Sequence, residues 1–308
     1  MAIMKKGQDL TDVTTAILTG MREILKKEKP DIVLVHGDTS TAFAASLAAF
    51  YQQIPVGHVE AGLRTYNMKS PYPEEFNRQA IGLTASLHFA PTQKAANALL
   101  KEGKDPERIF ITGNTGIDAL HYTVRSDFYH PETEWAKGSR LIAVTAHRRE
   151  NLGEPMRDMF RAIRRIVEEF TDVKVIYPVH LNPQVRKIAD EEFGGCERIH
   201  LIEPLDVVEF HNLMKASYLI MTDSGGIQEE APALGKPVLV MRDTTERPEG
   251  VEAGTLKLVG TKMEDIYREC RRLLTEPETY RKMSEARNPY GDGTASIKIR
   301  KILEDIDA

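Results

Sequence analysis

Short apolar runs alternate with longer amphipathic segments along the chain, and this alternation constrains the fold more than any other feature. Parallel strands joined by crossover helices produce such a pattern, because each crossover spans a dozen or more residues. The sequence therefore predicts the α/β class. The expected strands are residues 32–35, 56–59, 87–90 and 109–112, followed by 141–145, 173–177, 199–202, 218–221, 238–240 and 256–259.

A chain of 308 residues is long enough for two cores. Apolar residues at helical spacing predict that it opens with an amphipathic helix over residues 10–25. The unpatterned segment 125–139 is interpreted as an interdomain linker. We therefore expect an N-terminal domain over residues 1–125 and a second domain over residues 139–290. A C-terminal helix over residues 293–308 is expected to pack back on the first domain.

Charge and cysteine content exclude several classes. The net charge of -5, without a long run of one sign, gives no reason to expect nucleic acid or an anionic membrane as a partner. Cys196 and Cys270 have neither metal-binding nor redox spacing, which favours a reducing compartment and hence the cytoplasm. The first ten residues lack the apolar core of a signal peptide, and no window reaches roughly 18 uninterrupted apolar residues.

Polar motifs follow the expected strands at their carboxyl ends, where ligands bind in open parallel sheets. We expect two sheets that face each other across a cleft to bring these motifs together. The first half contributes HGDTST, HVEAGLRT and TGNTGID, and the second contributes TAHRRE, PVHLNP, TDSGGIQEE and RDTTERPEG.

The stretch TDSGGIQEE is interpreted as a phosphate seat. Gly225 and Gly226 let an anion approach backbone N–H groups, the Ser224 hydroxyl adds a donor, and Glu230 has the reach for a ribose diol. The alternative is that Ser224 is the N-cap of a closely packed helix. Nearby cations would suit a diphosphate, unless they are surface residues paired with Glu150, Glu246 or Glu249; they are His147, Arg148, Arg149, Arg242 and Arg247.

Carboxylates in the first half are candidates for general acid and base work. Asp38 and Glu60 each follow a strand closely. Asp38 has an alternative role as a helix N-cap, and Glu74 and Glu75 have one as first-turn acids that complement the helix dipole. His147 and His180 stand out by position, whereas His36, His58, His88, His121 and His200 are expected to be structural. No spacing indicates a metal site.

Eight motifs in order, spread over most of the chain, carry a resemblance to the bacterial non-hydrolysing UDP-N-acetylglucosamine 2-epimerases. They are HGDTST, VGHVEAGLRT, SPYPEEFNR, FITGNTGID, TAHRRENLG, YPVHLNP, TDSGGIQEEAPALGKPVLVMRDTTERPEGVEAGT and NPYGDG.

The resemblance implies two Rossmann-like domains in the GT-B arrangement and an isomerase acting as a homodimer. The implied reaction is reversible inversion at carbon 2, converting UDP-N-acetylglucosamine to UDP-N-acetylmannosamine for cell-surface polysaccharides. UDP would leave to give 2-acetamidoglucal and then add back, without a nicotinamide or metal cofactor.

The resemblance also implies roles for individual residues. Asp38, Glu60 and Glu74 match acid and base candidates, and His147 matches a catalytic histidine. Glu74, Arg148 and His180 match an allosteric substrate site found in some members. The matches to UDP contacts are Phe210, Ser224, Gly225, Gly226, Glu230 and Arg247.

One departure from the family pattern concerns the start of the chain. Members begin with a strand and a Gly-Thr-Arg-Pro-Glu turn, and nothing in residues 1–30 resembles that segment. We therefore expect the first domain to lack its initial strand–turn–helix segment, on the order of 60 residues. The alternatives are a hydrolysing epimerase that releases UDP and N-acetylmannosamine, a GT-B glycosyltransferase, and a truncated nucleotide-sugar-binding protein with little activity.

Overall fold

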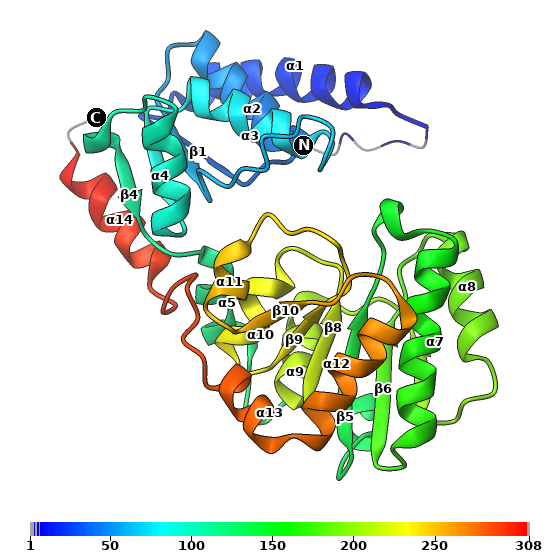
Figure 1. Ribbon diagram of the computed structural model, residues 1–308. Coiled ribbons are helices and arrows are strands. Elements are labelled where there is room, and N and C mark those ends of the chain that lie inside the picture. Colours follow the sequence, from blue (N-terminus) through cyan, green and yellow to red (C-terminus); the bar gives the residue numbers. More distant parts are fainter. Residues whose placement is uncertain (1–2, 4, 6, 307–308) are drawn as a thin grey trace. The chain divides into compact units, whose positions relative to one another are not determined.

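A computed structural model describes residues 3, 5 and 7–306. The chain forms two compact units, one comprising Met1–Thr115 with Tyr290–Ala308 and the other Gly116–Pro289 (Figure 1). The interpretation of residues 125–139 as an interdomain linker is wrong. This segment belongs to the second unit, because the Trp135 ring stacks on His200 at 3.5 Å and the Lys174 ammonium lies over the same indole.

The first unit contains a four-stranded parallel sheet in the order β1-β2-β3-β4. Asp9 and Asp12 close a capping box that starts its first helix, which is longer than the predicted one. Its elements are α1 (Leu10–Glu28), β1 (Val33–His36), α2 (Ser40–Tyr51), β2 (Val56–Val59), α3 (Glu74–Thr84), β3 (Leu87–Ala90), α4 (Gln93–Lys101), η1 (Pro106–Arg108), β4 (Ile109–Ile111) and α14 (Ala295–Asp305).

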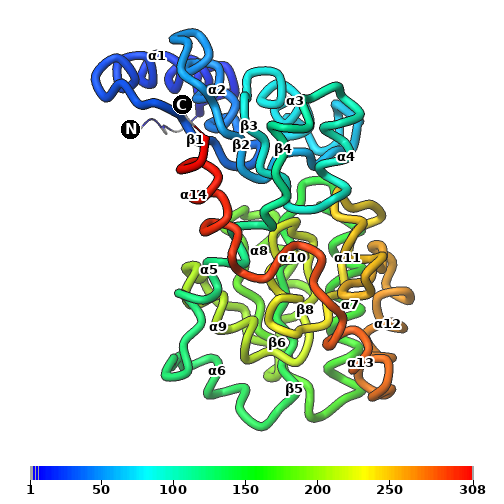
Figure 2. The backbone as a smooth tube through the Cα atoms, turned by 90° about the vertical axis from the view of Figure 1, so that its left-hand side faces the viewer, coloured from blue at the N-terminus to red at the C-terminus, as the bar shows by residue number. Residues whose placement is uncertain are grey.

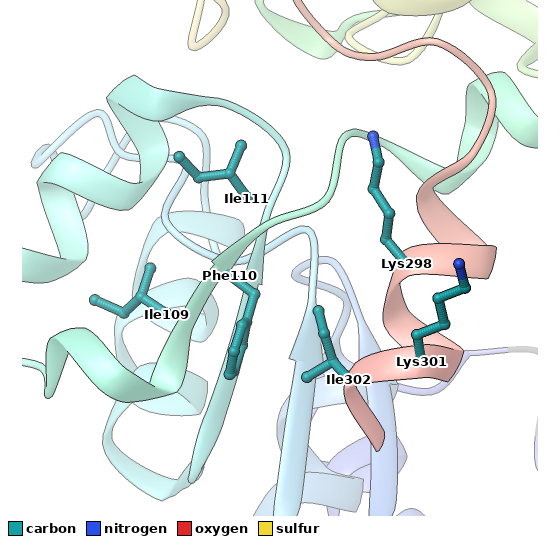
Figure 3. A pocket seen from close by; sticks show the side chains of 6 residues that line it. All are labelled: Ile109, Phe110, Ile111, Lys298, Lys301 and Ile302. Carbon is teal, nitrogen blue, oxygen red and sulfur yellow. The ribbon is translucent and has the colours of Figure 1, made fainter. Parts of the chain in front are cut away.

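The end of the chain returns to this first sheet, so that the red helix α14 lies in the same unit as the blue and cyan elements (Figure 2). Ile299 of α14 is buried with Val59 and Phe89, and Phe110 and Ile302 pack against the same cluster. Figure 3 shows Phe110 and Ile302 on the sides of β4 and α14 that face each other. Residues 307 and 308 of the expected C-terminal helix lie outside the described residues.

The second unit contains a six-stranded parallel sheet in the order β10-β9-β8-β5-β6-β7. Its elements are α5 (Thr115–Thr123), α6 (Pro131–Trp135), β5 (Arg140–Thr145), η2 (Arg149–Asn151), α7 (Glu154–Glu169), β6 (Val173–Pro178), α8 (Pro183–Phe193), β7 (Ile199–Ile202), α9 (Val207–Ala216), β8 (Leu219–Thr222), α10 (Ile227–Ala233), β9 (Val238–Val240), α11 (Pro248–Glu252), β10 (Leu256–Leu258), α12 (Met263–Thr275) and α13 (Pro277–Ser284).

Alternate residues of each central strand in this sheet face opposite cores. Ile142 and Val144 pack with helices α7, α8 and α12, whereas Leu141 and Ala143 pack with α9 and α10. Strands buried on both faces read as continuous apolar runs, which is why the sequence located them. All ten predicted strands are confirmed, with bounds within one residue. Within the described part of the chain, no helix combines the length and apolarity needed to span a bilayer.

Candidate functional site

The order of strands in the second sheet reverses between β5 and β8. The chain runs outward from β5 through β6 to β7, and then returns to build β8, β9 and β10 on the other side. Ligands of open α/β sheets bind beyond the carboxyl ends of strands at such a switch point. Thr145 and Thr222 are the paired last residues of β5 and β8, and their hydroxyl oxygens lie 2.6 Å apart. The motifs TAHRRE and TDSGG therefore start side by side.

Asp223 joins these two motifs and is fully buried. Its Oδ2 accepts hydrogen bonds from the backbone N–H groups of His147 and Arg148, both at 2.9 Å, and from Asn151 Nδ2 at 3.2 Å. Its Oδ1 lies 3.4 Å from His147 Nδ1. Sequence reasoning quoted this aspartate but assigned it no role. Its position directly between a buried strand and Ser-Gly-Gly is the sequence feature that could have marked this aspartate as a site residue.

The His147 side chain lies between the His180 ring and the Asp223 carboxylate. Its ring stacks on His180, with centroids 5.5 Å apart. Burial lowers the pKa of His147 below its ordinary value of 6.5, and the nearby Arg148 and His180 act in the same direction, although Asp223 opposes them. The environment therefore favours the neutral form of the imidazole.

Ser224 is not the cap of the following helix, so that alternative is wrong. Gly226 occupies the N-cap position of α10, and the Ser224 N–H donates to Thr222 Oγ1 at 2.9 Å. Within the described residues, no group accepts the N–H of Gly225 or Gly226. These two donors, next to the Ser224 hydroxyl, are the kind of group that binds an anionic oxygen.

Gly225 is required by packing as well. A Cβ placed on it would lie 2.6 Å from Arg247 Nη1 and 2.9 Å from Glu246 Oε1, both closer than van der Waals contact allows. Gly226 differs, since a Cβ there would meet nothing nearer than Glu230 Oε1 at 3.7 Å. The first glycine therefore allows the Arg247 guanidinium to lie against the backbone of the anion seat.

The expected cluster of strand-end cations exists only in part: Arg242 and Arg247 are buried, His147 and Arg148 are partly exposed, and Arg149 is exposed. Arg247 is buried and donates to Glu229 through Nε and to Glu246 through Nη1. Arg242 is buried too and donates to Glu246 Oε2 at 3.1 Å, with Glu150 3.3 Å from its Nε. Pairing with Glu150 and Glu246 was the predicted alternative. Both are partners of Arg242, but Glu150 is half exposed, whereas Glu246 belongs to a buried network. Sequence reasoning missed Glu229.

Glu230 lies at the far end of this seat. Its Oε2 is 3.5 Å from Nε2 of the buried His211, whose Nδ1 lies 2.7 Å from Thr123 Oγ1. Phe210 is partly buried and packs against the core under α9 and α10. All six predicted nucleotide contacts, Phe210 included, thus lie in the second unit.

In the first unit, Glu60 has an unusual backbone conformation. Its φ of 65° lies in the left-handed region, which costs a non-glycine residue on the order of 1–3 kcal/mol and is found mainly at functional sites. Its Oε2 lies 3.4 Å from His36 Nε2. A Cβ on Gly37 would come within 3.2 Å of the same oxygen. His36, expected to be structural, therefore faces a candidate catalytic carboxylate.

Asp38 is not an N-cap, because Thr39 caps α2 by accepting from the Ala42 N–H. The Asp38 carboxylate instead pairs with Arg78, whose Nε and Nη2 lie 2.8 and 2.7 Å from Oδ2. Arg78 in turn donates to Glu75 at 3.3 Å. Sequence reasoning did not identify Arg78.

Glu75 holds the loop that carries Glu60. It is fully buried and accepts from the N–H groups of Thr65 at 2.9 Å and Tyr66 at 3.0 Å, and from Gln79 Nε2 at 2.9 Å. Burial raises the pKa of the Glu75 carboxyl, but these hydrogen bonds and Arg78 together lower it by more, so the pKa lies below its ordinary value. Glu75 is therefore an ionised anchor.

Glu74, the first residue of α3, has one buried oxygen, Oε2, that forms no hydrogen bond in the described part of the chain. A buried carboxylate oxygen without a partner is costly unless a ligand supplies one. Among residues 3, 5 and 7–306, no group of three or more His, Cys, Asp or Glu side chains is placed to hold a metal ion.

Comparisons with known proteins agree with this arrangement. The family model for UDP-N-acetylglucosamine 2-epimerase matches residues 1–304. The UDP-N-acetylglucosamine 2-epimerase of Bacillus subtilis is 62% identical over 304 residues, which cover 99% of this chain and 79% of the relative.

Solved structures give the same result. A complex of S. aureus MnaA with UDP matches with a TM-score of 0.94 and 53% identity, covering 98% of this chain and 84% of the other. The UDP-GlcNAc 2-epimerase from Neisseria meningitidis, bound to UDP-GlcNAc, matches with a TM-score of 0.92, 47% identity and the same coverage. The α/β class with two parallel sheets of the GT-B type is confirmed. The chain belongs to the UDP-N-acetylglucosamine 2-epimerase family of isomerases.

Proposed function

We propose that this protein interconverts UDP-N-acetylglucosamine and UDP-N-acetylmannosamine by eliminating and re-adding UDP. A base removes the proton from carbon 2 while the bond between carbon 1 and the UDP oxygen breaks, which gives 2-acetamidoglucal and UDP. An acid then protonates carbon 2 on the opposite face, and UDP adds back to carbon 1. The reaction is redox-neutral: carbon 2 loses one proton and gains one, and the UDP that leaves carbon 1 is added back to it.

The second unit holds UDP in this proposal. The observation that carries it is the Ser224–Gly226 segment, whose two glycine N–H groups find no acceptor among the described residues and whose first glycine lies against Arg247. These donors and the guanidinium suit a diphosphate whose charge grows as carbon 1 is released. Glu230 receives the ribose diol, and Phe210 packs near the uracil.

Asp38, Glu60 and Glu74 are the proposed acid and base groups. Glu60 lies in a strained turn facing His36, and Asp38 pairs with Arg78. Glu74 has a buried oxygen that forms no hydrogen bond within the described part of the chain. His147, whose pKa is lowered by burial, is a further proton-exchanging candidate.

Two finer assignments are part of the proposal. Arg148 and His180, with Glu74, contribute to a second substrate site through which UDP-N-acetylglucosamine activates its own conversion. The protein also acts as a homodimer. Substrate-dependence curves test the first assignment and analytical ultracentrifugation tests the second.

Proton NMR of UDP-N-acetylglucosamine incubated with the protein in heavy water tests the reaction. We expect a new anomeric signal for UDP-N-acetylmannosamine and loss of the carbon 2 proton signal, because solvent deuterium replaces that proton. Product that keeps its original hydrogen would contradict elimination. Accumulation of free UDP with free N-acetylmannosamine would show a hydrolysing enzyme instead.

A further inference from the structure

The carboxylate of Asp223 has two oxygens with different surroundings. Oδ2 accepts from two backbone N–H groups and the Asn151 amide, so its bonding capacity is largely used by the loop 147–151. Oδ1 is buried, forms no hydrogen bond with any residue that the structure describes, and lies 3.4 Å from His147 Nδ1. The three donors on Oδ2 thus fix the carboxylate with its other oxygen directed at the imidazole.

The imidazole itself is only partly enclosed. The His147 side chain is 39% exposed, whereas Asp223 is completely buried. A ring with Nδ1 toward a buried carboxylate leaves Nε2 as the nitrogen that a ligand can reach. Stacking on His180 further limits rotation of the ring.

We propose that Asp223 is a positioning residue that holds His147 in the Nδ1–H tautomer and so presents the Nε2 lone pair for proton exchange. The inference rests on the proposed function of His147. An Nδ1–H directed at Oδ1 is attractive, whereas a lone pair there would face a negative charge. When Nε2 takes a proton, the carboxylate stabilises the imidazolium without itself being protonated. The separation shortens to a hydrogen bond once the site is occupied.

Adjacency in sequence gives this arrangement a second consequence. Asp223 immediately precedes Ser224 and Gly225, the proposed phosphate contacts. The residue that orients His147 and the residues proposed to bind phosphate therefore belong to one continuous segment that follows β8.

The substitution Asp223→Asn tests the proposal because it is nearly isosteric. The three donors that hold Oδ2 require an acceptor, so the amide oxygen takes that place and the amide NH₂ turns toward His147 Nδ1. A donor at that point favours the opposite, Nε2–H tautomer. Long-range proton–nitrogen NMR of the imidazole rings distinguishes the tautomers under mildly alkaline conditions, and His147→Gln identifies the signals.

We expect the Nδ1–H tautomer in the wild type, the Nε2–H tautomer in Asp223→Asn, and a fall in kcat of at least about tenfold. UDP affinity, measured by calorimetry, should change little. Asn151→Ala is the matched control, because it removes a donor to Oδ2 but leaves Oδ1 facing the ring; its tautomer should be that of the wild type.

An Nε2–H tautomer in the wild-type protein would overturn the proposal, and this measurement requires no variant of Asp223. An unchanged tautomer or an unchanged kcat in Asp223→Asn would overturn it as well. If the wild type does not epimerise the sugar nucleotide, the proposed function fails, yet the tautomer comparison still decides whether Asp223 orients His147.

Discussion

The substitution Gly225→Ala provides a sharp test of how the second unit is built, because the neighbouring glycine is a natural control. A Cβ at position 225 would lie 2.6 Å from Arg247 Nη1 and 2.9 Å from Glu246 Oε1. Arg247 is buried and bonded to two carboxylates, so its guanidinium cannot simply swing away. The added methyl must therefore displace a paired charge.

Overpacking of this kind costs about 1–3 kcal/mol, which for a unit of this size lowers Tm by about 2–12 °C. Displacement of Arg247 should also weaken UDP binding. Loss of one charge-assisted contact, worth about 1.5–3 kcal/mol, corresponds to roughly a ten- to hundredfold loss of affinity.

Gly226→Ala should behave differently. Gly226 is exposed, its φ of -60° is ordinary for alanine, and its Cβ would have no contact nearer than 3.7 Å. We expect its stability to equal or slightly exceed that of the wild type. Thermal unfolding monitored by circular dichroism, with calorimetric titration of UDP, compares the two variants. If Gly225→Ala is as stable as Gly226→Ala, the inference that Arg247 packs against the backbone at position 225 is wrong.

Three further predictions concern the charged groups. Asp38→Asn and Glu60→Gln should each lower turnover by about a hundredfold or more while circular dichroism shows an intact fold, and near-normal rates would leave both residues with structural roles only. Arg247→Ala should destabilise the second unit by about 3–5 kcal/mol in urea unfolding, because Glu229 and Glu246 each lose a charged hydrogen-bond donor in the interior; an unchanged midpoint would contradict this. Burial lowers the pKa of His58 from 6.5 to about 3. As the pH falls between these two values, His58 is protonated in the unfolded state but stays neutral in the folded state. The free energy of unfolding should therefore fall by up to about 1.4 kcal/mol per pH unit relative to His58→Gln, and parallel pH profiles of the two proteins would refute it.

The sequence predicted the sheets well because central strands such as β2, β3, β5 and β8 are buried on both faces and therefore read as apolar runs. The partly exposed strands β1 and β4 were located because their residues are mostly apolar all the same. It also placed the polar motifs correctly at the strand ends. It could not supply the partners, since Arg78 contacts Asp38 across 40 positions and His147 faces Asp223 across 76. Nor could composition separate a linker from a surface helix, because residues 131–135 are polar and form α6 all the same.

The arginines of the nucleotide seat are immobilised by the folded chain itself. A guanidinium held between carboxylates loses side-chain conformational entropy worth up to about 1.5–2 kcal/mol. Here that entropy is lost when the chain folds, not when a ligand binds. The same carboxylates compete with a ligand for the guanidinium. If UDP binds as proposed, its phosphate therefore replaces a carboxylate as the partner of the guanidinium instead of neutralising an unpaired charge. Such a seat should capture and release UDP with little rearrangement, and with less sensitivity to ionic strength than an exposed basic surface would show.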